Sequence, residues 1–247
     1  MRVLSLVHQW DAASGVFADA VAEAGHELVE RNVAEAGVPE EEFGAVLVFG
    51  GAMHVDQEER HGWLRDEDGY LRRLVEEDVP VLGVCLGGQL LAKALGAPVR
   101  RMPSSEVGWY EVELTPEAAG DPVFGALPGR FDSFQWHSYA FELPAGAVLL
   151  ARGDRCHQAY RAGETAWGLQ FHAEVTRATV DEWIESSKPE DDRAIDFARL
   201  RTESDRRMGR WNELGKEICR RFLAVAERPR ARRARGATTR ATSPRSS

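Results

Sequence analysis

Cysteine is scarce in this chain of 247 residues, and its three cysteines follow no regular spacing. They are Cys85, Cys156 and Cys219, an odd number, which argues against the paired disulfide framework of a small secreted protein. The chain has no C-x-x-C pair of the kind that marks many zinc sites. We therefore expect a protein of a reducing, cytoplasmic compartment, with no bound metal or other cofactor.

Long apolar runs are also missing. No stretch approaches the roughly 20 apolar residues that a membrane-spanning helix needs. The apolar start, residues 1–7, is too short for the core of a secretory signal and leads straight into polar residues. Neither membrane insertion nor secretion is expected from these features.

Acidic residues are absent from the last twenty positions, 228–247, which carry seven arginines. Without these arginines the chain has 24 basic and 40 acidic residues, so its net charge is near −16 instead of −9. Such an acidic body argues against a general nucleic-acid binder. The basic segment is rich in Ala, Ser, Thr and Pro, and we expect a disordered, solvated tail there rather than a nucleic-acid or partner arm.

Apolar segments and helical patterns alternate in the first hundred residues. Strands are predicted at residues 1–7, 45–49 and 80–84, and helices at 15–24, 66–77 and 87–95. Alternation of this kind is typical of an α/β fold with a mainly parallel sheet. The acidic residues 66–68 are interpreted as the N-terminal face of a helix and not as a metal site.

The pattern changes after residue 107. Short apolar stretches at 109–114, 131–134, 147–150, 158–161 and 166–171 are separated by Pro and Gly turns, which indicates antiparallel strands. Helices are predicted around 179–186, 192–202 and 211–225. The simplest division is one domain, 1–227, with a helical C-terminal extension at 176–227 and the basic tail at 228–247.

A nucleophile turn is predicted at Cys85. The apolar residues 80–84 run directly into a predicted helix, and Gly83 and Gly87 lie two residues on either side of the cysteine. This is the thiol counterpart of the strand-turn-helix that presents a serine nucleophile. The N-terminal end of the helix would favour the reactive thiolate. A lone cysteine after an apolar strand is more often a small core residue, and the flanking glycines reverse that interpretation.

A thiol nucleophile needs a base and a group that orients the base. His172 follows an apolar stretch, and Glu174 can point to the same side of an extended segment and fix the tautomer of the ring. Gly50 and Gly51 end another apolar strand, where backbone groups can approach a ligand. The N–H groups of Gly51 and Leu86 could hold an oxyanion, although Gly50–Gly51 alone is equally consistent with a plain turn.

Four segments resemble class I (triad) glutamine amidotransferases, especially stand-alone proteins similar to the amidotransferase part of GMP synthase. They run in the family's order: Phe49-Gly50-Gly51-Ala52-Met53, Gly83-Val84-Cys85-Leu86-Gly87-Gly88-Gln89, Phe134-Gln135-Trp136-His137-Ser138 and Gly168-Leu169-Gln170-Phe171-His172-Ala173-Glu174. The resemblance implies a seven-stranded, flavodoxin-like α/β sheet with helices on both faces.

The resemblance also implies roles. Cys85 would be the nucleophile, His172 the general base and acid, and Glu174 its orienting group. Gly51 and Leu86 would be backbone oxyanion donors. The expected substrate-binding residues are Gly50, Gln89, His137, Ser138 and Tyr139, with Gln89 contacting bound glutamine and the segment 137–139 holding its α-carboxylate and α-amino end.

Two positions depart from the family pattern. Gly88 stands where many members carry His or Ala, which we expect to reshape the pocket slightly. Ala173 stands where Pro is usual, so the turn between His172 and Glu174 is expected to be less stiff. The residues after Thr176 contain no glycine-rich phosphate loop, so no acceptor site for ammonia is expected there.

Three functions remain open on the sequence. The first is release of ammonia from L-glutamine through a γ-glutamyl thioester. The second is hydrolysis of another γ-glutamyl amide or peptide by the same residues. The third is an amidotransferase component that is inactive without a separate synthase partner. The acidic body of this chain would suit a basic surface on such a partner. Trp109, Trp136 and Trp167 are interpreted as packing residues and not as substrate contacts.

Overall fold

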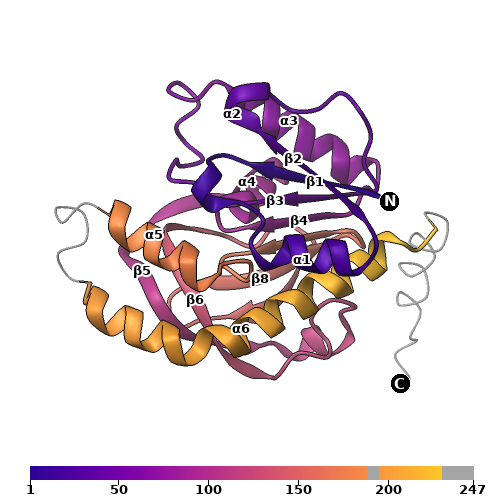
Figure 1. Ribbon diagram of the computed structural model, residues 1–247. Coiled ribbons are helices and arrows are strands. Elements are labelled where there is room, and N and C mark those ends of the chain that lie inside the picture. Colours follow the sequence, from indigo (N-terminus) through magenta and orange to yellow (C-terminus); the bar gives the residue numbers. More distant parts are fainter. Residues whose placement is uncertain (188–194, 230–247) are drawn as a thin grey trace, which may run out of the picture.

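The structure is a computed structural model that describes residues 1–187 and 195–229. Nine strands of these residues form one mixed sheet, in the order β2-β1-β3-β4-β9-β8-β7-β5-β6 (Figure 1). The α/β class is therefore confirmed, whereas the seven strands implied by the resemblance are too few. Most of the predicted basic tail, 230–247, lies outside the described residues.

The half of the sheet from β2 to β9 is parallel. Its strands are β2 (Glu27–Asn32), β1 (Arg2–Val7), β3 (Ala45–Val48), β4 (Val81–Val84) and β9 (Ala166–Leu169). The predicted strands at 1–7, 45–49 and 80–84 are confirmed. Strand β2 was not predicted, because it lies at the sheet edge and carries charged residues that hide its pattern.

The other half is antiparallel, as four of the five short apolar stretches predicted, whereas the fifth, at 166–171, forms β9, which pairs parallel with β4 and antiparallel with β8. This half contains β8 (His157–Ala162), β7 (Val148–Arg152), β5 (Val99–Leu114) and β6 (Arg130–Phe141). Strand β5 begins well before the predicted stretch at 109–114. Arg101 pairs with Tyr139 and Glu106 pairs with His137, so residues 102–105 form a bulge opposite Ser138. Bulges of this kind bend a strand and redirect its side chains.

Helices cover both faces of the sheet. One core cluster joins α1 (Val16–Glu23), α5 (Arg177–Ser186) and α6 (Phe197–Ala226) to one face. The other joins α2 (Val33–Ala36), α3 (Trp63–Glu76) and α4 (Leu86–Ala94) to the opposite face. Short 3₁₀ turns lie at Trp10–Ala12 and Pro116–Gly120. Successive residues of β1, such as Val3 and Leu4, belong to different clusters, as expected for a strand buried on both sides.

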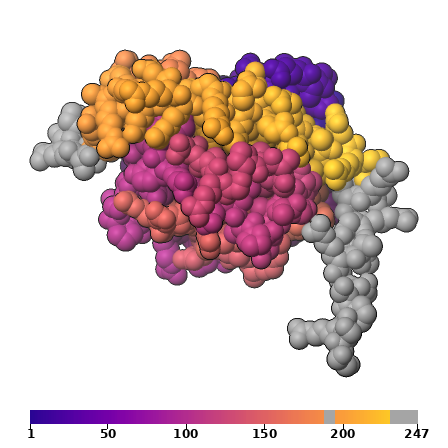
Figure 2. All heavy atoms as spheres, turned by 90° about the horizontal axis from the view of Figure 1, so that it is seen from below, coloured from indigo at the N-terminus to yellow at the C-terminus, as the bar shows by residue number. Residues whose placement is uncertain are grey.

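The two helices predicted at 192–202 and 211–225 are one continuous helix, α6, insofar as they lie within the described residues. Its buried residues recur three or four positions apart from Leu200 through Met208 and Trp211 to Phe222, so a single apolar stripe faces the core. Figure 2 shows α6 running along one side of the molecule next to the N-terminal segment. Among the described residues, no helix combines the length and apolar character needed to cross a membrane.

Candidate active site

Cys85 occupies the turn between β4 and α4 and is 6% exposed. Its backbone has φ +52° and ψ −110°, a conformation that non-glycine residues rarely adopt. The Cys85 N–H donates to the carbonyl of Leu169 on β9 at 2.8 Å, which ties the turn to the neighbouring strand. A strained residue at a strand-to-helix turn is the geometry that presents a nucleophile above the sheet.

The glycines around Cys85 are required by close packing of backbones. A Cβ at Gly83 would lie 2.5 Å from the carbonyl of Gly87, and one at Gly87 would lie 2.2 Å from the carbonyl of Val48. A Cβ at Gly88 would lie 2.6 Å from the carbonyl oxygen of Leu169. Gly88 therefore allows the close contact between α4 and β9, and the expectation that it reshapes the pocket stays a prediction.

His172 lies beyond the end of β9 and is 2% exposed. Its Nδ1 donates to Oε1 of Glu174 at 2.7 Å, as expected for a base and its orienting carboxylate. The other ring nitrogen, Nε2, is buried and has no hydrogen-bond partner within the described residues. This nitrogen is available for proton transfer in the pocket that His172 shares with Cys85.

Electrostatics favour a protonated His172. Burial acts to lower the pKa of the ring, but the charges of Glu174 and of the Cys85 sulfur outweigh it and raise this pKa to about 10. A cationic ring beside the sulfur stabilises a thiolate. The carboxylate of Glu174 thus lies behind the ring, and the cysteine sulfur lies on the pocket side.

The loop that carries His172 and Glu174 is held by the helices packed against it. The indole Nε1 of Trp211 donates to the carbonyl of His172 at 2.8 Å. Asn212 donates to the carbonyl of Val175, and the N–H of Val16 donates to the carbonyl of Glu174. Ala173 stands where Pro is usual, and the turn between His172 and Glu174 was expected to be looser for that reason. Contacts from α6 and α1 instead hold this turn in place.

Gly50 and Gly51 lie beside the Cys85 turn. A Cβ at Gly50 would be 3.0 Å from Cε1 of His172 and 3.8 Å from Cβ of Cys85, so only glycine leaves room for the ring in this position. Within the described residues, no protein acceptor is found for the N–H of Gly51 or of Leu86, the first residue of α4. Two free backbone donors near one sulfur suit an oxyanion.

A pocket of about 460 Å³ opens in front of Cys85. It is lined by Gln89, Ser138 and Tyr139, as predicted for the substrate-binding residues, and by Arg101, which was not predicted. The amide of Gln89 donates to the carbonyl of Tyr139 at 2.8 Å, which fixes the segment that faces the pocket. No sequence signal marks Arg101, because only the pairing of β5 with β6 brings it beside Tyr139.

A second pocket of about 290 Å³ adjoins Cys85 on the side of His172. Its walls include Trp136 and Trp183 together with polar groups of Gln9 and Ser186. Trp136 therefore borders both pockets, so the interpretation of this residue as mere packing is incomplete. Trp167, in contrast, is fully buried in the core, as predicted.

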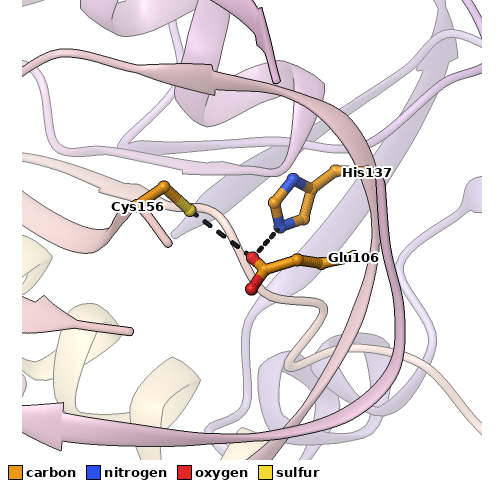
Figure 3. A group of neighbouring side chains, drawn as sticks. All are labelled: Glu106, His137 and Cys156. Atoms are coloured by element: carbon orange, nitrogen blue, oxygen red, sulfur yellow. Dashed lines mark hydrogen bonds and ion pairs between the residues drawn. The ribbon is translucent and has the colours of Figure 1, made fainter. Parts of the chain in front are cut away.

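His137 also lines the pocket of about 460 Å³, and its buried side chain lies in a cluster with Glu106 and Cys156 (Figure 3). The ligand atoms of these three lie within 4.8 Å of one another and are of the types that bind transition metals. Both ring nitrogens, however, face oxygen acceptors: Nε2 is 3.1 Å from Glu106 Oε2, and Nδ1 is 3.1 Å from the carbonyl of Tyr139.

Arg155 lies 4.0 Å from the second carboxylate oxygen of Glu106, and burial raises the pKa of the Cys156 thiol well above its usual range. A metal ion would have to displace a proton from His137, take a reluctant thiol and tolerate the nearby guanidinium. These residues fit an ion-paired support beneath the pocket better than a metal site. The absence of a metal stays a prediction.

His8 and Glu67 were not predicted as functional residues. His8 directly follows β1 at the carboxyl edge of the sheet, and that position is the sequence signal that could have found it. The acidic residues 66–68 were interpreted as the N-terminal face of a helix; among them, Glu67 is fully buried and ion-paired with His8 at 3.0 Å. Helix α3 begins at Trp63, earlier than predicted, and turns Glu67 toward the sheet.

Comparison with known proteins agrees with this geometry. Residues 15–187 match the family model for glutamine amidotransferase class-I. The chain is 27% identical over 227 residues to the glutamine amidotransferase-like protein YfeJ of Salmonella typhimurium, covering 89% of this chain and 95% of that one. It is 38% identical over 103 residues to a subunit of the glutamine-hydrolyzing GMP synthase of Thermococcus kodakarensis, covering 40% of this chain and 53% of that one.

Solved structures are similar over more of the chain. A crystal structure of a glutamine amidotransferase from Thermotoga maritima superposes with a TM-score of 0.81 at 30% identity, covering 92% of this chain and 99% of the other. A glutamine amidotransferase from Methylobacillus flagellatus has the same TM-score at 25% identity, with 92% and 95% covered. The chain thus belongs to the class I glutamine amidotransferase family.

Proposed function

We propose that this protein hydrolyses the side-chain amide of L-glutamine, with Cys85 as nucleophile, His172 as acid and base, and Glu174 as the orienting group. One observation carries the proposal. The strained Cys85 turn lies beside the charged His172 and beside two backbone N–H groups, those of Gly51 and Leu86, for which the described residues offer no acceptor. Residues 1–227 would act as one amidotransferase domain, to which α6 contributes by holding the His172 loop.

In the first half-reaction the Cys85 thiolate attacks the δ-carbonyl carbon of glutamine and forms a C–S bond. The N–H groups of Gly51 and Leu86 hold the oxyanion of the tetrahedral intermediate. The C–N bond then breaks while His172 gives its proton to the departing nitrogen. Ammonia leaves, and a γ-glutamyl thioester remains on Cys85.

In the second half-reaction His172, now neutral, takes a proton from a water molecule that attacks the thioester carbonyl. The same N–H groups hold the second oxyanion. Collapse of this intermediate breaks the C–S bond, so that glutamate leaves and the thiolate and imidazolium return. The sum is glutamine and water giving glutamate and ammonia.

The larger pocket would hold the amino-acid end of the substrate. The segment around Ser138 and Tyr139 presents backbone groups to it, and Gln89 fixes that segment. Arg101 supplies a guanidinium suited to the α-carboxylate. Gly50 leaves the space in which the ring of His172 meets the substrate amide.

A second candidate is another γ-glutamyl amide with a larger leaving group. The pocket on the side of His172 favours it, because a leaving amine would emerge there and Trp136 and Trp183 offer apolar walls. Glutamine and a panel of γ-glutamyl amides with growing alkyl or aryl amine groups separate the two candidates. A higher kcat/KM for the larger amides would favour the second.

A separate synthase subunit is a proposed partner. The likeness to one subunit of a GMP synthase supports it, although that likeness covers 40% of this chain. The acidic body would suit a basic partner surface. Ammonia would then pass to an acceptor bound on the partner.

The test is release of glutamate from L-glutamine by the purified protein, measured beside Cys85→Ala. We expect turnover that the substitution abolishes, with the fold of the variant checked by circular dichroism. Turnover by Cys85→Ala equal to that of the unchanged protein would overturn the assignment. Trapping of a γ-glutamyl adduct on Cys85, detected by mass spectrometry after acid quench, gives an independent check.

A further inference from the structure

His8 and Glu67 form an ion pair beneath the active-site loop. His8 follows the last residue of β1, and Glu67 projects from α3, on the chain 59 positions later. Both side chains are fully buried, and Nε2 of His8 lies 3.0 Å from each carboxylate oxygen of Glu67. The indole of Trp63 stacks on the imidazole with ring centroids 5.3 Å apart. Because both groups are buried, each depends on the other as its hydrogen-bond partner.

The other nitrogen of His8 contacts the active-site loop of Gly50 and Gly51. Nδ1 lies 3.1 Å from the carbonyl oxygen of Gly50. The carbonyl of Gly50 only accepts hydrogen bonds, so Nδ1 of His8 must donate to it, while Nε2 faces the carboxyl group of Glu67. Burial opposes the charge, but Glu67 and the Gly50 carbonyl outweigh it and raise the pKa of His8.

The contact fixes the direction of a catalytic donor. The carbonyl of Gly50 and the N–H of Gly51 belong to one planar trans peptide and point in opposite directions. Holding the carbonyl toward His8 therefore points the N–H away from it, and that N–H has no protein acceptor within the described residues. The next residue after Gly51 is also held, because the side chain of Gln9 accepts a hydrogen bond from the N–H of Ala52 at 2.9 Å.

We infer that His8, held by Glu67, is a positioning residue that orients the Gly50–Gly51 peptide as an oxyanion donor. The inference rests on the proposed function, in which Gly51 stabilises the tetrahedral intermediates. Glycines have no side chain to hold such a peptide, so without His8 the peptide can rotate by a small change of backbone angles. His8 does not touch the reacting atoms.

Two double variants test the inference with matched packing. In both, Glu67→Gln removes the buried carboxylate, so that no unpaired charge remains. His8→Asn places an amide Nδ2 where histidine carries Nδ1 and keeps a donor for the Gly50 carbonyl. His8→Leu has a similar size but no donor. Thermal unfolding of both proteins shows whether they fold equally well.

The first readout is the orientation of the Gly50–Gly51 peptide in crystal structures of the unchanged protein and both variants. The inference expects the original orientation in the His8→Asn double variant and a rotated or disordered peptide in the His8→Leu one. An unchanged peptide in the folded His8→Leu protein overturns it. This readout needs no turnover, so it stands even if Cys85-dependent glutamine hydrolysis is not found.

The second readout is kinetic. Loss of an oxyanion donor lowers kcat by roughly 10²-fold while the substrate still binds, because the contact forms in the transition state. We expect kcat of the His8→Leu variant to be at least about tenfold below that of the His8→Asn variant, with a change in the KM for glutamine under about threefold. Equal kcat in the two folded proteins would contradict a positioning role.

Discussion

His172 and Glu174 are joined by a hydrogen bond of 2.7 Å from Nδ1 to Oε1, with only Ala173 between them in the chain. This contact leaves Nε2 as the nitrogen that faces the pocket. The pKa of His172, about 10, reflects burial opposed by the charges of Glu174 and of the Cys85 sulfur. Removing either charge should therefore lower it.

Cys85→Ala is predicted to lower the pKa of His172, because the negative sulfur no longer stabilises the imidazolium. A pH titration of the ring by NMR measures this pKa in both proteins. Cys156→Ala is the control, since that thiol does not contribute to the pKa of His172. An unchanged pKa in Cys85→Ala would show that no thiolate lies beside the ring.

Stability should depend on pH through the same group. The folded-state pKa of about 10 exceeds the ordinary histidine value of 6.5, so the folded protein binds this proton more tightly. The stabilisation is fully present below pH 6.5 and is lost as the pH rises toward 10. The free energy of unfolding, measured with denaturant, should fall less between these two pH values in Glu174→Gln than in the unchanged protein. Equal losses would contradict the contribution of this pair.

Gly50→Ala is predicted to lower kcat by roughly tenfold or more, because its Cβ would meet the ring of His172 at 3.0 Å and displace it. The control is Gly69→Ala on the exposed side of α3, where a Cβ meets nothing within 4 Å. That change should stabilise the protein by about 0.5–1 kcal/mol without affecting kcat. Steady-state kinetics and thermal unfolding of both variants check the pair of outcomes. A Gly50→Ala enzyme with full activity would mean that the ring does not need this space.

Trp211→Phe is predicted to destabilise the protein by about 1–3 kcal/mol and to lower kcat, because the buried carbonyl of His172 loses its donor. Trp109→Phe is the matched control. It loses an indole bond to Ser204 but keeps an aromatic ring at the position that packs against Trp211. We expect kcat to fall in the first variant only, measured at a temperature where both are folded. The same kcat in both would indicate that α6 stabilises the fold without holding the catalytic loop.

Arg101→Ala is predicted to raise the KM for glutamine roughly tenfold with little change in kcat, as expected for a residue that binds the α-carboxylate in ground and transition states alike. Arg100→Ala removes a neighbouring exposed arginine that does not line this pocket. Initial rates over a range of glutamine concentrations separate KM from kcat. Equal KM values for the two variants would exclude Arg101 from substrate binding.

The local geometry of the site was predictable from the sequence. The apolar run before Cys85 and the glycines around it specify a strand, a tight turn and a helix. Each of these three elements depends only on residues that are close together in the sequence. The spacing of His172 and Glu174 also predicts their contact, because alternate residues of an extended segment point the same way. The parallel half of the sheet followed from alternating strands and helices, apart from the charged edge strand β2 and from β9, which was predicted among the antiparallel strands.

Contacts between distant segments were not predictable in this way. Glu67 looks like a solvated residue on a charged helix, and only the packing of α3 on the sheet buries it against His8. Arg101 on β5 lines the pocket because β5 pairs with β6, and the indole of Trp211 on α6 donates to the carbonyl of His172. The sequence by itself determined which residue types stand at the turn and in what order. The tertiary structure decided what holds them, because those contacts join positions whose separation along the chain leaves no local pattern.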